Sequence, residues 1–99
     1  MKETNIGKYV IVRGRSSGVF AGTLAAKDGT EVTLTDCRRI WYWEGAASIS
    51  QLAIDGTNKP GGCKFPAPVK EITILDAIEI IHCTENAEAS IKAGREWKC

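Results

Sequence analysis

Short runs of β-branched, aromatic and aliphatic residues, separated by turn-forming residues, occupy the first half of the chain. Such runs are typical of strands, and an Asp-Gly pair between two of them is typical of a tight hairpin. Gly22 lies inside the second run and indicates a bulge or sharp bend, which small barrels need at their corners. The pattern predicts strands at 8–13, 19–26, 31–36 and 38–43.

A helical pattern follows the last of these runs. Ser48 and Gln51 have the spacing of a capping box, in which Ser48 is the N-cap and Gln51 reaches back to it. The apolar residues that follow share one side of a helix, which Gly56 ends. Residues 57–68 are rich in proline and glycine, and they predict a loop or a lid.

A second β-rich block lies at 71–83. Its isoleucine and threonine residues favour strand over helix, and Asp76 marks a bend or short turn. Thr84 then begins a short helix that Gly94 ends. The chain is therefore predicted to be one domain, 1–99, of the mainly β (α+β) class. We expect a small, strongly bent antiparallel sheet or an SH3- or Sm-like partial barrel with one or two short helices.

Composition and charge argue against some classes of function. A net charge of +1 over 99 residues argues against charge-driven binding to duplex nucleic acid. The sequence has no apolar run of membrane-spanning length and no signal-peptide pattern at its start, so we expect a cytoplasmic protein without a membrane partner. So short a chain buries a modest core, which together with the aromatic block predicts a homo-oligomer.

The four cysteines do not have the spacing of a metal site, because no Cys-x-x-Cys pair occurs. In the cytoplasm they are expected to be reduced. Cys37 and Cys83 are predicted to be small core residues, and Cys99 is predicted to be exposed. We expect neither a metal nor a cofactor.

Residues 37–51 hold the most informative pattern, two arginines and two tryptophans before a capped helix start. Guanidinium groups, aromatic faces and free helix N–H groups bind anionic, ring-bearing ligands. In an extended strand Arg39, Trp41 and Trp43 would share one face, with Ile40 and Tyr42 on the other. The alternative is structural, with the tryptophans in the core or a subunit interface and the arginines covering them. The candidate ligand-binding residues are Arg38, Arg39, Trp41, Trp43, Ser48, Ser50 and Gln51.

Weaker candidates lie elsewhere. The basic turn at 13–18 could bind phosphate, and the segment 59–64 could cover the site. His82 and Cys83 point to opposite faces of a strand, which makes a catalytic pair geometrically poor. Asp76 and Glu79 have the wrong spacing for paired carboxylates on one strand face. No catalytic constellation emerges, so we expect the protein not to be an enzyme.

Two resemblances add to this interpretation. Residues 19–24 (VFAGTL) and 32–36 (VTLTD) resemble the first half of the Sm-like motif, although Asp28-Gly29-Thr30 stands where that family carries its RNA-binding Asn. The whole chain resembles a family of small phage and prophage proteins known as a domain of unknown function. That resemblance is carried by residues 6–13 (IGKYVIVR), 38–48 (RRIWYWEGAAS) and 96–98 (EWK).

Short phage proteins include sponges that sequester nucleotide signals of bacterial immunity. By analogy, the leading hypothesis is a non-catalytic, phage-encoded sponge for a small phosphate-bearing, nucleotide-like ligand, such as a cyclic nucleotide or a cyclic ADP-ribose. It would act in the host cytoplasm. Two alternatives stay open: an Sm-like RNA-binding module, and a structural or protein-inhibitor protein whose tryptophans form a protein interface.

Overall fold

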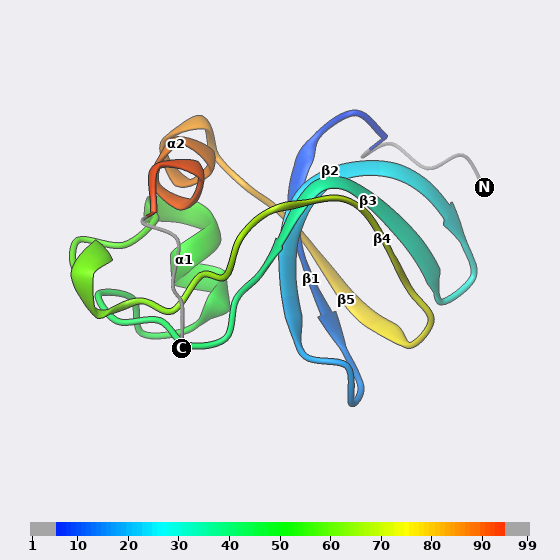
Figure 1. The fold of residues 1–99 in the computed structure, drawn as a ribbon, viewed down its shortest axis with the longest axis horizontal. Helices are drawn as coiled ribbons and strands as arrows, with labels where there is room; N and C mark the ends of the chain where they lie inside the picture. Colours follow the sequence, from blue (N-terminus) through cyan, green and yellow to red (C-terminus); the bar gives the residue numbers. More distant parts are fainter. Residues whose placement is uncertain (1–5, 95–99) are drawn as a thin grey trace.

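The computed structural model describes residues 6–94, which form one curved antiparallel sheet with two short helices at one end (Figure 1). The strands follow the order β4-β3-β2-β1-β5 across the sheet. Within residues 6–94, no helix has the length and apolar character needed to cross a membrane. The elements are β1 (Tyr9–Gly14), β2 (Val19–Asp28), β3 (Glu31–Arg39), α1 (Ile49–Asp55), the 3-10 turn η1 (Pro60–Gly62), β4 (Val69–Ile74), β5 (Ala77–His82) and α2 (Glu85–Ala93).

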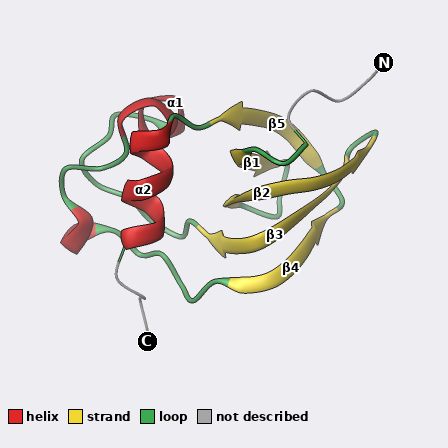
Figure 2. Ribbon diagram, turned by 90° about the horizontal axis from the view of Figure 1, so that it is seen from above, coloured by secondary structure: helices red, strands yellow, loops and turns green. Residues whose placement is uncertain are grey.

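The chain connectivity requires the sheet to curl. β4 and β5 lie at opposite edges of the sheet, yet only Leu75 and Asp76 separate them along the chain. Three Cα–Cα steps join Ile74 to Ala77 and span about 11 Å at most, so the ends of the two edge strands must lie close together. Figure 2 shows the resulting half-open shape, with the helices at one end of the curved sheet. The predicted mainly β class with a strongly bent sheet is confirmed, and the sheet is not closed into a barrel.

A bulge opposite Gly22 produces part of this curvature. Between the pairs Ala21–Arg38 and Thr23–Thr35, β2 advances by two residues and β3 by three. The extra residue is Asp36, whose φ of 47° lies in the left-handed region that Asp tolerates better than most residues. The bend predicted at Gly22 is therefore confirmed, although the inserted residue belongs to the neighbouring strand.

Two apolar clusters share β1. Val10 and Val12 face the inside of the curved sheet, where they join Phe20 and Leu34 among others. Tyr9 and Ile11 have the opposite orientation and pack with residues of both helices. A strand buried on both faces is expected to be apolar throughout, and only Arg13 is exposed in β1.

Three cysteines are buried and free, Cys37, Cys63 and Cys83. The predicted core positions of Cys37 and Cys83 are thus confirmed, whereas Cys99 lies outside the described residues. Burial raises the pKa of the Cys37 and Cys83 thiols to about 12, so both stay protonated and unreactive near neutral pH.

Both predicted helices are present. Ser48 caps α1 and Gly56 ends it with a φ of 71°, while Thr84 and Gly94 cap α2. The predicted strand at 38–43 is wrong beyond Arg39, where β3 ends. The N–H groups of Trp41 and Tyr42 donate to the carbonyl of Lys64, so the chain leaves β2 and makes only an isolated bridge there.

The close approach at Gly22 gives a stability test. A Cβ at this position would lie 3.0 Å from Cys37 Cα and 3.1 Å from the Thr35 carbonyl oxygen. We expect Gly22→Val to lower the free energy of unfolding by about 1–3 kcal/mol or more, measured by urea denaturation. A Cβ on Gly61 meets no atom within 4 Å, so Gly61→Ala is the matched control and should change little. Equal losses in the two variants would contradict the tight packing at Gly22.

Candidate functional site

An open groove of about 450 Å³ lies between the β1–β2 turn and the β4–β5 turn. The turn between β1 and β2 and the adjoining ends of β2 and β3 form one wall, and the end of β4 with the β4–β5 turn forms the other. The walls are mainly apolar, with one cation and one carboxylate. The lining residues are Ser17, Phe20, Arg39, Ile72, Thr73, Ile74, Leu75 and Asp76.

Arg39 is the cationic group of this groove. Its guanidinium carbon lies 4.5 Å from the centre of the Phe20 ring, and Nη1 donates to the Ser17 carbonyl at 2.8 Å. A guanidinium has five N–H donors, and this is the one hydrogen bond that Arg39 makes among the described residues. Stacking holds the planar group in place while most of its donors stay available to a ligand.

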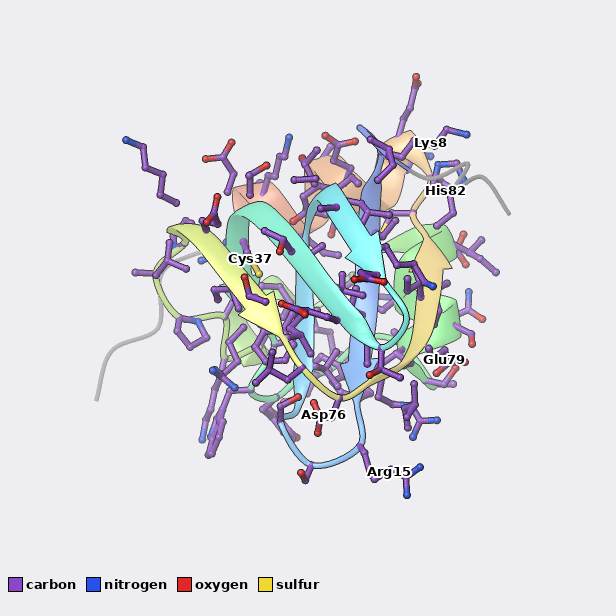
Figure 3. All side chains as sticks on the ribbon, turned by 90° about the vertical axis from the view of Figure 1, so that its right-hand side faces the viewer. Lys8, Arg15, Cys37, Asp76, Glu79 and His82 are labelled. Carbon is purple, nitrogen blue, oxygen red and sulfur yellow. The ribbon has the colours of Figure 1, made fainter. Side chains whose placement is uncertain are left out.

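Asp76 joins the two walls. Its carboxylate accepts hydrogen bonds from the Ser17 hydroxyl and from the Ser16 amide and hydroxyl, and its carbonyl accepts from the Arg15 N–H. These bonds, led by that of Ser17, lower its pKa to about 2, so the carboxylate is ionised at neutral pH. Figure 3 shows Asp76 beside the β1–β2 turn. Ser17 therefore contacts both charged groups of the groove.

Trp41 shares the face of Arg39 but does not line the groove. Along this extended segment the Ile40 N–H donates to Val19 and the Trp41 N–H donates to Lys64, on opposite sides of the chain. Ile40 is buried toward the helices, so Arg39 and Trp41 lie on the other face. The Trp41 side chain is 64% exposed.

Trp43 and Tyr42 depart from the predicted alternation. Trp43 packs against the cluster between sheet and helices, and Tyr42 is 48% exposed. The alternation breaks because residues 41 and 42 both donate to the Lys64 carbonyl, which shifts the chain after Trp41. Trp43 therefore does not share a face with Arg39 and Trp41.

Arg38 is buried and has a structural role. The residue is only 4% exposed, and its guanidinium donates to carbonyl oxygens of Phe65, Pro66, Ile91 and Gly94 at 2.9–3.1 Å. Two of these carbonyls belong to the last turn and cap of α2, where a cation is favoured by the helix dipole. Arg38 thus joins β3 to α2 and to the segment before β4, and we leave it out of the candidate site.

The start of α1 is also separate from the groove. α1 packs on α2, β1 and β5, whereas the groove is built from β2, β3, β4 and the turns. The Ser48 hydroxyl accepts from the Gln51 N–H as predicted, but the Gln51 side chain bonds to Asp55 instead of reaching back. Ser50 is exposed. α1 has only seven residues, and its N-terminus is too short a helix end to form a ligand site by itself.

The weaker candidates also lie in defined places. Turn residues 16 and 17 bind Asp76, and residue 17 lines the groove. The segment 59–64 packs against residues 42–44, with Cys63 Sγ 3.5 Å from the Glu44 carbonyl, and does not line the groove. His82 is exposed at the end of β5, beside Lys8 in Figure 3. Among residues 6–94, no group of His, Cys, Asp and Glu side chains could hold a metal ion.

Of the seven predicted site residues, the structure therefore keeps Arg39 at a groove and Trp41 on the same face. Phe20 and Asp76 were missed as groove residues. The available signal was the break at Asp76 between two apolar runs, because a short turn there joins two edge strands and carries its residues toward the first hairpin.

The fold and the groove define a small half-open β-sheet domain with one arginine at its mouth. The chain belongs to the family described as "Domain of unknown function (DUF6948)", which matches residues 7–91. Of the three segments that carried the resemblance to a phage family, residues 96–98 lie outside the described residues. No curated protein and no solved structure matches the chain.

Neighbouring arginines in different environments give a second stability test. We expect Arg38→Lys to lower the free energy of unfolding by about 2–4 kcal/mol, because an ammonium cannot keep four bonds to separate carbonyls. Arg39→Lys is the matched control and should cost less than about 1 kcal/mol. Urea denaturation measures both, and amide exchange in α2 should rise only in the Arg38 variant. Equal effects would contradict the structural role of Arg38.

The hydrogen bonds from Ser16 and Ser17 to the Asp76 carboxylate predict that the folded protein loses stability in acid. A carboxylate whose folded pKa lies at about 2, below its ordinary 3.8, adds stability above pH 3.8 that is lost as the pH falls toward 2. Thermal melts from pH 6 to pH 2 should show this loss in the wild type. The loss should be smaller in Asp76→Asn, which has no charge to protonate. Identical pH profiles for the two proteins would contradict the assignment.

Proposed function

We propose that the protein is a non-catalytic binder of a small phosphate-bearing, nucleotide-like ligand, held in the groove at Arg39. The observation that carries the proposal is the stacked guanidinium at the mouth of an apolar-walled groove, with one of its five N–H donors used within the described structure. A fixed planar donor group fits the oxygens of a phosphate, and stacking on Phe20 reduces the entropy lost on binding.

The dimensions and energies support a ligand of this class. Ligand pockets commonly enclose about 300–1,000 Å³, and the groove has about 450 Å³. A charge-assisted hydrogen bond contributes about 1.5–3 kcal/mol, and a base stacked on an aromatic side chain adds about 1–3 kcal/mol. At the upper end of these ranges, two such bonds at Arg39 and a stack on the exposed Trp41 ring beside the groove would total about 9 kcal/mol and reach micromolar affinity.

The polar groups of the groove support binding over catalysis. Ser17 and Asp76 are hydrogen-bonded, which could suggest a nucleophile and a base. The low pKa of Asp76 makes it a poor proton acceptor at neutral pH, and two further bonds from Ser16 occupy its other oxygen. The Ser16, Ser17 and Asp76 contacts thus hold the groove walls together.

In the cell, the proposed binder would act as a sponge. A protein that binds a nucleotide-like immune signal without converting it lowers the free concentration of that signal. Phage origin, action in the host cytoplasm and a cyclic nucleotide or cyclic ADP-ribose as ligand belong to the proposal. So does a homo-oligomer, in which a second subunit would cover the open side of the groove.

One observation favours a second candidate function. Trp41 and Tyr42 are adjacent, and both are largely exposed, at 64% and 48%. Large aromatic side chains are enriched at the centres of protein interfaces. A protein-inhibitor role would use these rings against a host protein and would not need Arg39.

Titration calorimetry with a panel of cyclic dinucleotides, cyclic mononucleotides and cyclic ADP-ribose isomers tests the leading proposal. We expect at least one member to bind, and Arg39→Gln to weaken that binding at least tenfold through loss of charge-assisted bonds. Arg13→Gln is the matched control, because Arg13 is exposed and pairs with Glu79 outside the groove. The control should bind like the wild type. Absence of heat and of thermal stabilisation across the panel would refute the proposal.

Three further measurements separate the alternatives. Mass spectrometry of what leaves the heat-denatured protein, purified from cells that make candidate signals, should detect a small molecule. A stoichiometric host protein in a pull-down, abolished by Trp41→Ala and retained in Arg39→Gln, would favour the inhibitor role. A gel shift with oligo-U or oligo-A would instead favour RNA binding.

A further inference from the structure

We infer that the groove selects phosphodiesters, which carry one charge per phosphate, over phosphomonoesters, which carry nearly two. The inference rests on the proposed function, because it assumes that a phosphate binds at Arg39. It goes further by naming the chemical form of that phosphate. The structural basis is the pairing of one guanidinium with one carboxylate on otherwise uncharged walls.

The charges of the groove balance before a ligand enters. Arg39 is the one cation and Asp76 is the one anion among the lining residues. Both contact Ser17, whose carbonyl accepts from Arg39 and whose hydroxyl donates to Asp76. The two charges are therefore held on either side of a single residue, and neither can be moved far from the other without breaking these bonds.

Three charged residues near the β1–β2 turn do not change this balance. Arg15 belongs to the same turn, but Figure 3 shows its side chain extending away from Asp76. Its link to Asp76 is a main-chain bond, from the Arg15 N–H to the Asp76 carbonyl at 2.9 Å. Arg13 is paired with Glu79 at 3.0 Å. Glu79 extends from β5, apart from Asp76, in the same view.

The first ligand charge gains charge-assisted hydrogen bonds from the N–H donors that Arg39 leaves available, whereas a second charge would gain little and lose hydration. Its attraction to Arg39 is offset by its repulsion from Asp76, because both groups line the same groove. The remaining walls are Phe20, Ile72, Ile74 and Leu75 with two hydroxyl residues, which offer no further cation. Removing an unpaired charge from water costs free energy that these walls cannot return. One negative charge per phosphate is therefore the best match.

The groove therefore favours ligands whose phosphates are all internal to a ring or chain. Cyclic mononucleotides and cyclic dinucleotides satisfy the condition. A nucleoside 5′-monophosphate or the ring-opened form of a cyclic dinucleotide has a terminal phosphate and does not. The difference between the two groups is the second negative charge, because the base and sugar are the same.

The experiment compares, by calorimetry at pH 7.5, each cyclic mononucleotide and cyclic dinucleotide of the panel with its ring-opened phosphomonoester. We expect the phosphodiester of the tightest pair to bind about tenfold more tightly, the size of one partly screened charge interaction. Equal or tighter binding of the phosphomonoester overturns this inference and leaves the proposed function intact. Failure of both forms to bind across the panel overturns the proposed function and this inference with it.

Two variants locate the origin of the selectivity. Asp76→Asn removes the carboxylate and should reduce the preference to about twofold, provided that its melting curve at pH 7.5 shows a folded protein. Leu75→Lys adds a cation at a side chain that is 72% exposed, where a polar residue is tolerated, and should also reduce or reverse the preference. Leu75→Gln is its uncharged control and should keep the wild-type ratio. A preference that survives both charge changes would refute the electrostatic origin.

Discussion

The two-residue turn between β4 and β5 is the constraint on which the site depends. It joins the two edge strands of a five-stranded sheet, so the sheet must bend until its outer ends meet. Asp76, one of the two turn residues, then lies against the β1–β2 turn and accepts three hydrogen bonds from Ser16 and Ser17. Without this bend, the end of β4 would not face Phe20 and Arg39, and there would be no groove.

Strand alternation gives two adjacent arginines opposite roles. Arg38 points toward the helices, where its guanidinium donates hydrogen bonds to main-chain carbonyls. Arg39 points to the open face and stacks on Phe20. The pairing Ala21–Arg38 and Phe20–Arg39 shows the same division on β2, because Ala21 and Phe20 belong to different apolar clusters. The buried guanidinium holds the helical layer to the sheet, and the exposed one is the candidate anchor for a ligand.

Local patterns predicted most of the helices and strands but only some of the residues of the candidate site. The hairpin at Asp28-Gly29, the bend at Gly22 and the caps Ser48 and Thr84 depend on a few neighbouring residues, so the sequence reveals them. The end of β3 at Arg39 cannot be predicted in this way. It depends on the Lys64 carbonyl, distant in sequence, which accepts hydrogen bonds from the amides of Trp41 and Tyr42.

The same distinction applies to the residues of the candidate site. Strand alternation places the two neighbouring arginines on opposite faces, but the partners that bury Arg38 lie 27–56 positions away. The helix start at Ser48 was expected beside the arginines because it is close in sequence, and the fold places it with α2, β1 and β5 instead. Phe20 and Asp76 come together with Arg39 only through the curl of the sheet.

The pairing of β1 with β5 also has a kinetic consequence. Val10 pairs with His82, so this ladder joins segments separated by most of the chain, whereas β1, β2 and β3 are consecutive hairpins. Closing so long a loop is slow compared with forming hairpins. During synthesis the first three strands can assemble early, but the second wall of the groove must wait until β4 and the β4–β5 turn have left the ribosome. The groove therefore forms later than the β1–β2–β3 hairpins.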